Sequence, residues 1–183
     1  RRRCLKKSAK RKAQSAKLKI ETKAGIIESQ VNGDNVRIKL TDPKDIKLGM
    51  MIKINNRNLK VNFIDTGVPH TVIFVEGLDK IDVLNLGRKI RYHKRFAPRG
   101  TNVDFVEVLD DNSIKIRTYE RGVEVATALI TCCKLGAGQY GKIDVHTNSG
   151  EILRVYFDKI GNNFKNIWLQ GKACIVFRGQ FLY

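Results

Sequence analysis

Two stretches of the chain share one pattern, Ile20-Glu21-Thr22-Lys23-Ala24-Gly25 and Val145-His146-Thr147-Asn148-Ser149-Gly150, at an offset of 125 residues. Each combines a strand, a T-x-x-G turn and the beginning of a second strand. Each also follows a predicted helix, at residues 4–16 in the first copy and 125–134 in the second. The shared order of helix, strand, turn and strand predicts two related halves, with the chain crossing between them near residue 65.

The sequence outward from these two copies consists mainly of strands. Asn32-Gly33-Asp34 lies between two runs of alternating apolar residues and is a strong hairpin signal. A helix is predicted over residues 81–91. Further strands are predicted at residues 51–54, 59–64, 72–75, 101–108, 113–118, 152–157, 166–169 and 173–177. The pattern is typical of an α/β (α+β) chain.

The charge of the chain is strongly asymmetric. Its 183 residues contain 35 Lys and Arg against 18 Asp and Glu, a net charge of +17. The segment from Arg1 to Lys19 holds ten basic residues and no acidic one. Such a segment is either a solvated charged helix or an arm that contacts RNA or another polyanion. Because no aromatic residue interrupts it, any binding would be salt-sensitive and not specific for sequence. The candidate polyanion-binding residues are Arg1, Arg2, Arg3, Lys6, Lys7, Lys10, Arg11 and Lys12.

Composition excludes several classes of protein. No apolar run approaches the ~18 residues of a membrane-spanning helix, and the basic N-terminus has no apolar core of a signal peptide. The four cysteines have no C-x-x-C spacing and the three histidines are scattered, so no metal site is expected. A reducing, cytoplasmic setting follows. Because the chain begins with Arg1 and not Met, we expect that it was processed or lacks its natural beginning.

Four motifs in the middle of the chain occur in a recognisable order: Asp65-Thr66-Gly67-Val68-Pro69-His70, Gly87-Arg88-Lys89-Ile90-Arg91-Tyr92-His93, Gly100-Thr101-Asn102-Val103-Asp104-Phe105-Val106 and Arg117-Thr118-Tyr119-Glu120-Arg121-Gly122. In this order and spacing the chain resembles the bacterial diaminopimelate epimerase family. The resemblance extends from about Cys4 to the C-terminus.

The resemblance implies an α/β (α+β) fold of two pseudo-symmetric halves, each a mostly antiparallel, barrel-like sheet around a central helix. The family inverts one stereocentre of diaminopimelate, for lysine and cell-wall synthesis, without pyridoxal phosphate or another cofactor. One cysteine thiolate removes the α-proton and an opposite thiol returns a proton. Each cysteine opens a Gly-containing loop at the start of a helix, where free N–H groups and the helix dipole stabilise a thiolate.

Five residues of this chain match substrate-contact motifs of the family. Glu120 and Arg121 match its E-R-G motif, in which the glutamate pairs with the substrate ammonium and the arginine with a carboxylate. Asn102 matches the asparagine of a T-N-V motif. Pro69 and His70 match a P-H motif that lines the cleft, although Val68 stands where many members have asparagine.

Neither catalytic cysteine of the family is matched. Cys4 corresponds to a non-catalytic cysteine, and Arg1 stands where the last glycine of the first loop is expected. Glu124 leads directly into Val125 where the second loop, ending in C-G-T-G, is expected. Cys132 and Cys133 lie ~10 Å along the predicted helix and do not substitute for a thiol at its start.

We therefore expect a truncated or degenerate member, inactive as written. Residues 1–64 would be a remnant of the N-terminal half and residues 65–183 the C-terminal half, whose last strand can return to the first. The alternative is a non-catalytic derivative that binds RNA or a ribonucleoprotein through its basic N-terminal helix. The expected partners are diaminopimelate, RNA or another polyanion, and a second copy in a homodimer; no membrane is expected.

Overall fold

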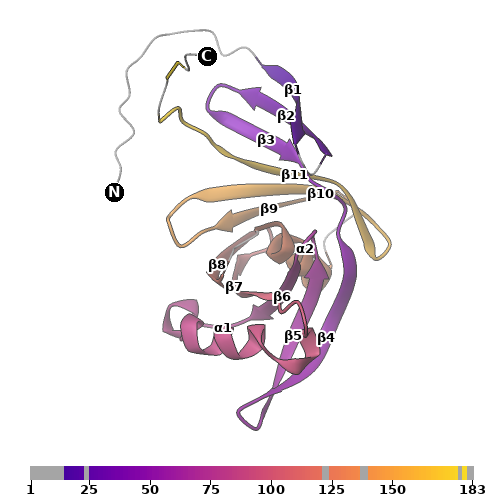
Figure 1. Cartoon of the computed structure of the whole chain (residues 1–183), viewed down its shortest axis with the longest axis vertical. Coiled ribbons are helices and arrows are strands. Elements are labelled where there is room, and N and C mark those ends of the chain that lie inside the picture. Colours follow the sequence, from indigo (N-terminus) through magenta and orange to yellow (C-terminus); the bar gives the residue numbers. More distant parts are fainter. Residues whose placement is uncertain (1–14, 23–24, 121–123, 137–139, 177–178, 181–183) are drawn as a thin grey trace.

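The computed structural model describes residues 15–22, 25–120, 124–136, 140–176 and 179–180. In this part of the chain the strands form one mixed sheet of 11, in the order β1-β2-β3-β11-β10-β9-β8-β7-β6-β5-β4 (Figure 1). The first elements are β1 (Ala16–Thr22), β2 (Gly25–Asn32), β3 (Asn35–Lys39), β4 (Lys44–Ile54), β5 (Arg57–Asp65) and β6 (Pro69–Phe74). The later ones are α1 (Val83–Arg91), β7 (Asn102–Asp110), β8 (Ser113–Tyr119), α2 (Glu124–Leu135), β9 (Tyr140–His146), β10 (Ile152–Ile160) and β11 (Asn163–Lys172).

Turn chemistry and helical crossovers together set the order of the strands. Asn32 pairs with Asn35, so the predicted hairpin turns on Gly33 and Asp34, with Gly33 at a φ of 60°. Only two neighbouring pairs are parallel, β6 with β7 and β8 with β9. A helix connects each of them, α1 in the first and α2 in the second, as parallel pairing requires.

The sheet wraps around α2, which is buried on all sides over most of its length and fills the centre of the fold. Eight consecutive residues of α2, Val125 to Cys132, are buried. They pack in one cluster with residues of strands β5 to β11, including Phe157 and Phe164, whose rings meet edge to face at 5.3 Å. A second cluster fills the space between α1 and the other face of the sheet. The α+β prediction, a mostly antiparallel barrel-like sheet around a central helix, is confirmed.

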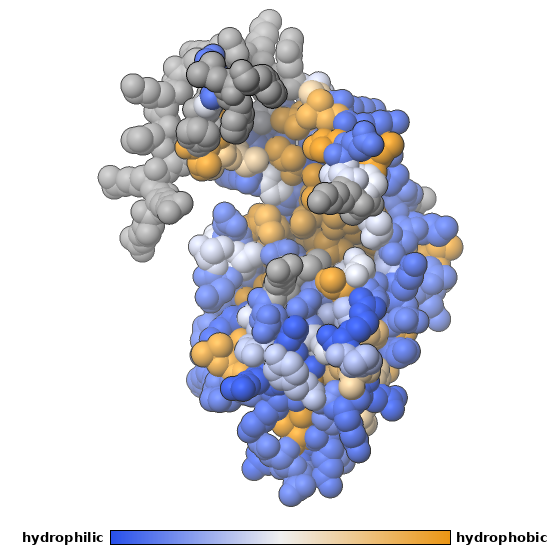
Figure 2. Space-filling model, viewed as in Figure 1, coloured by the Kyte–Doolittle hydropathy of each residue, from blue (hydrophilic) through white to orange (hydrophobic). Residues whose placement is uncertain are grey.

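Strands β1 to β3 extend this sheet above the body (Figure 1), because β3 pairs with β11. They carry exposed apolar side chains such as Leu18 and Ile20, each 47% exposed. The space-filling view shows hydrophobic residues gathered between these upper strands and the lower body (Figure 2).

Two expected elements differ from the structure. The predicted helix at residues 4–16 lies outside the described residues except for its end, and there Ala16 already begins β1. The expected strand at 173–177 is irregular from Ala173 to Val176. The reason is that β11 runs to Lys172, opposite Asn35, and the amide of Ala173 donates to Asp34 in the hairpin turn, where the partner strand ends.

The described helices include none that is long and apolar enough to cross a membrane. Strand β5 runs through residue 64 and pairs with β6, so both sides of the expected division belong to one sheet. The division into residues 1–64 and 65–183 stays a prediction.

Candidate functional site

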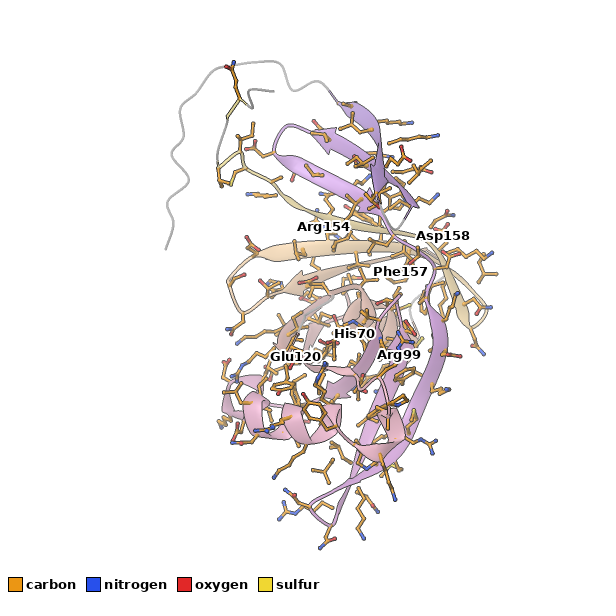
Figure 3. All side chains as sticks on the ribbon, viewed as in Figure 1. His70, Arg99, Glu120, Arg154, Phe157 and Asp158 are labelled. Carbon is orange, nitrogen blue, oxygen red and sulfur yellow. The ribbon has the colours of Figure 1, made fainter. Side chains whose placement is uncertain are left out.

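The parallel pairing of β6 and β7 places two of the predicted site residues side by side. His70 is in register with Asn102, and both lie at the start of their strands. Strand β8 is antiparallel to β7, so it ends at the same edge of the sheet, and Glu120 follows it directly. Three motifs that are far apart in sequence therefore meet at one edge of the sheet, where Figure 3 labels His70 and Glu120.

His70 is fully buried and is held by Asp104. Its Nδ1 lies 2.8 Å from Oδ2 of Asp104, and both side chains are 0% exposed. Because a carboxylate only accepts, Nδ1–H donates to it, and Nε2 lies on the other side of the ring. The amide Nδ2 of Asn102 is 3.5 Å from that Nε2, at the limit of a hydrogen bond. The second carboxylate oxygen, Oδ1 of Asp104, is buried without a hydrogen-bond partner among the described residues.

Arg91, at the end of α1, connects Asn102 to Glu120. Its Nη1 donates to the carbonyl of Thr101 at 3.2 Å and to Oδ1 of Asn102 at 3.4 Å. Its Nε lies 3.7 Å from Oε1 of Glu120. Glu120 has a φ of 78°, the left-handed region, which a residue other than glycine rarely adopts. The backbone at Glu120 is therefore strained at the point where its carboxylate meets Arg91.

Pro69 faces the opposite side of the sheet from His70, since neighbouring residues of a strand alternate. Its ring lines a pocket of about 360 Å³ together with Phe63, Phe96 and Arg99. The guanidinium of Arg99 lies 3.6 Å from Oδ2 of Asp65 at the same pocket. The P-H motif thus contributes to two different surfaces.

Glu124, the first residue of α2, adds a third carboxylic acid near His70 and Asp104. Burial raises the pKa of this carboxyl above its ordinary value, and repulsion by Asp104 adds to the effect while His70 opposes it. It stands at the helix start, beside which the family resemblance leads us to expect the second cysteine loop.

Cys132 and Cys133 lie in the last turns of α2, about 12 Å along the helix from its start. Burial raises the pKa of both thiols above the ordinary value, so they stay protonated near neutral pH. The position of the two thiols on the helix and their protonated state fit packing residues better than a catalytic acid/base pair. In the part of the chain that the structure describes, no cluster of metal-binding side chains is present.

Arg121 and the eight basic residues of the N-terminal arm lie outside the described residues. Sequence reasoning had not singled out Arg91, Asp104 or Glu124. Asp104 had a readable signal, because it is a lone carboxylate in the apolar run from Val103 to Val106, and a buried charge needs a partner. Arg91 had none, because its role depends on how α1 packs.

Comparison with known proteins places the chain among characterised sequences and folds. A sequence model of the family described as diaminopimelate epimerase matches residues 62–164. The chain is 38% identical to the diaminopimelate epimerase of Aquifex aeolicus over 90% of its own length, and 38% identical to that of Hydrogenobaculum sp. over 89%. It spans about 61% of the length of each of these relatives.

The fold is also similar to a solved structure of a hydroxyproline epimerase from Agrobacterium vitis, at a TM-score of 0.66 and 14% identity. That match covers 86% of this chain and 56% of the other. The family match extends over more than half of the chain and includes the edge where His70, Asn102 and Glu120 meet. This chain belongs to the diaminopimelate epimerase family.

Proposed function

We propose that this protein is a diaminopimelate epimerase scaffold that keeps one wall of the substrate site but does not catalyse epimerisation. The observation that carries the proposal is the set of His70, Asn102 and Glu120 at one sheet edge, with Arg91 contacting two of them. Diaminopimelate offers ammonium and carboxylate groups at both ends. The carboxylate of Glu120 suits an ammonium, and the amide of Asn102 can donate to or accept from either group. Arg121, next to Glu120 in sequence, would supply the matching guanidinium.

The second half of the proposal rests on the chemistry of inversion. An inverted carbon needs a base on one face and an acid on the other, both in contact with the Cα. The sequence of α2 begins with Glu124 and Val125, without a cysteine in its first turn. The thiols of Cys132 and Cys133 lie too far along the helix and are too weakly acidic to take this role. Such reduced thiols are typical of the cytoplasm, which we propose as its location.

Incubation of the chain with diaminopimelate in D₂O is expected to give no deuterium at the α-carbon, measured by loss of the α-proton signal in NMR. The same mixture is expected to show binding by calorimetry. Replacing Glu120 with glutamine should weaken that binding about ten-fold, because a charge-assisted hydrogen bond is lost.

The relative from Aquifex aeolicus is the positive control for exchange, and an Asp111→Asn variant, at an exposed turn, is the matched control for binding. Measurable exchange by this chain would contradict the loss of catalysis. Absence of diaminopimelate binding, or equal affinity in the Glu120→Gln and Asp111→Asn variants, would contradict the proposal that the substrate site is retained.

A second candidate function rests on the ten basic residues between Arg1 and Lys19. We propose that this arm contacts the phosphates of RNA. Deleting residues 1–12 should flatten the salt dependence of RNA affinity by about 0.7 in log–log slope for each phosphate contact removed, measured by filter binding at two salt concentrations.

A scrambled arm of the same composition is the control, and it should bind like the natural arm because contacts with phosphates are independent of sequence. Unchanged affinity at low salt after the deletion would exclude the arm from binding.

A further inference from the structure

The face of β1-β2-β3-β11-β10-β9 that points away from α2 carries two rows of polar side chains. Residues paired across strands point to the same side of a sheet. The other side of β9, β10 and β11 holds Val145, Val155 and Ile167, which are buried against α2. We call the two rows together the outer face. The first row is Lys17, Gln30, Arg37, Gln170, Arg154 and Asp144. The second is Lys19, Glu28, Lys39, Trp168, Tyr156 and Lys142.

Arg37 lies over two aromatic rings at the middle of the outer face. Its guanidinium carbon is 5.1 Å from the centre of the Trp168 ring and 5.9 Å from that of Tyr156. Its Nε donates to Oε1 of Gln30 at 2.8 Å, which fixes the plane of the guanidinium. The hydroxyl of Tyr156 donates to Oε1 of Gln170 at 3.3 Å. Two half-buried aromatic rings and one oriented guanidinium plane are thus held in place on an open sheet.

The outer face is also positively charged and contains a groove. Its two rows contain six cations and two carboxylates. Arg154 is neutralised by Asp144 through two hydrogen bonds of 2.7 and 2.9 Å, and Lys39 lies 4.0 Å from Glu28, so Lys17, Lys19 and Arg37 carry most of the excess positive charge. Lys17, Arg37 and Gln170 line a groove of about 510 Å³ that runs across the strands. Arg154 on β10 is labelled in Figure 3.

We propose that the outer face binds single-stranded nucleic acid, with bases stacked on Trp168, Tyr156 and the guanidinium of Arg37. Phosphates would be neutralised by Lys17 and Lys19, both exposed on β1. Aromatic rings and Arg planes on a sheet are the surfaces on which unpaired bases stack, and the amides of Gln30 and Gln170 suit the hydrogen-bonding edges of bases. An acidic peptide would use the cations but not the rings. This surface is separate from the edge with His70 and Glu120 and does not depend on the function proposed for that edge.

Trp168 is the single tryptophan of the chain, so its fluorescence reports on this surface alone. Titration of the full chain with a fluorescein-labelled single-stranded RNA of 20 nucleotides and mixed sequence is expected to quench Trp168 as anisotropy rises. Arg37→Gln should weaken binding about ten-fold and reduce the quenching. Trp168→Ala should weaken it by a similar factor, whereas Trp168→Phe, which keeps a ring for stacking, should restore most of the affinity.

Lys134→Gln is the matched control, because Lys134 also lies over an aromatic ring, Phe74 at 4.0 Å, but on the α2 side. The Lys134→Gln variant should show the same rise in anisotropy and the same quenching of Trp168 as the unchanged chain. Circular dichroism checks that each variant is folded. Binding without quenching of Trp168 would assign the RNA to the arm and overturn the proposal, as would equal affinity in the Arg37→Gln variant. If polyglutamate quenches Trp168 as strongly as RNA does and displaces the RNA, the proposed nucleic-acid site is instead a general site for acidic chains.

Discussion

His70→Phe is expected to lower the free energy of unfolding by about 3–5 kcal/mol, the usual cost of breaking a buried ion pair or charged hydrogen bond from one side. The ring keeps most of the volume, so the loss isolates the hydrogen bond to Asp104. That carboxylate is fully buried, and its Oδ1 is already without a partner in the described part of the chain. Removing the donor at 2.8 Å leaves both oxygens desolvated and unpaired. Urea denaturation followed by circular dichroism measures the change.

The double variant His70→Phe with Asp104→Leu is expected to recover most of this loss, because replacing both polar partners by apolar ones removes the unpaired charge. His146→Phe, at a half-buried position on β9, is the matched control and should change stability by no more than about 0.5 kcal/mol. A loss below 1 kcal/mol for His70→Phe, or no recovery in the double variant, would show that Asp104 does not depend on His70.

Gly87→Ala is expected to destabilise the protein by about 1–3 kcal/mol, the cost of overpacking a tight contact. Gly87 is buried in the middle of α1, where glycine costs a helix about 1 kcal/mol relative to alanine, so propensity alone predicts a gain. A Cβ at this position would lie 2.4 Å from the Cβ of Tyr119 on β8. Neither atom can move without shifting a backbone, so the clash outweighs the propensity. Thermal unfolding measures the sign.

The same substitution should also disturb the candidate site. Tyr119 precedes Glu120, and α1 carries Arg91. A shift between α1 and β8 therefore alters the distance of 3.7 Å between Nε of Arg91 and Oε1 of Glu120. Affinity for diaminopimelate should therefore fall together with stability. Lys89→Ala, exposed on the same helix, is the control and should change neither. A stabilising effect of Gly87→Ala would mean that α1 can move away from β8 without cost.

Much of the fold could be read from local sequence. The alternation around Asn32-Gly33-Asp34 predicted the β2–β3 hairpin, and the apolar run from Val125 predicted α2, because turn residues and hydrophobic periodicity act over a few neighbouring positions. The end of the strand at Ala173 could not be read in this way. It depends on where β3, far away in the sequence, stops offering a partner.

The candidate site divides in the same manner. His70, Asn102 and Glu120 were named from their motifs, but the strand expected at residues 72–75 left Pro69 and His70 outside it. Strand β6 begins at Pro69, and this extension makes Pro69 and His70 face different surfaces. The link through Arg91 and the pair of His70 with Asp104 join residues at least 10 positions apart in the chain.

The sequence by itself determined the family, the strands and helices with strong periodicity, and the absence of a cysteine where α2 begins. These depend on residue identity and spacing, which are local. The tertiary structure alone decided that β6, β7 and β8 end at one edge, that Asp104 is paired, and that Arg37 lies over Trp168 and Tyr156 on an open face. Each of these contacts joins strands brought together only by the register of the sheet, and register is a property of the folded chain as a whole.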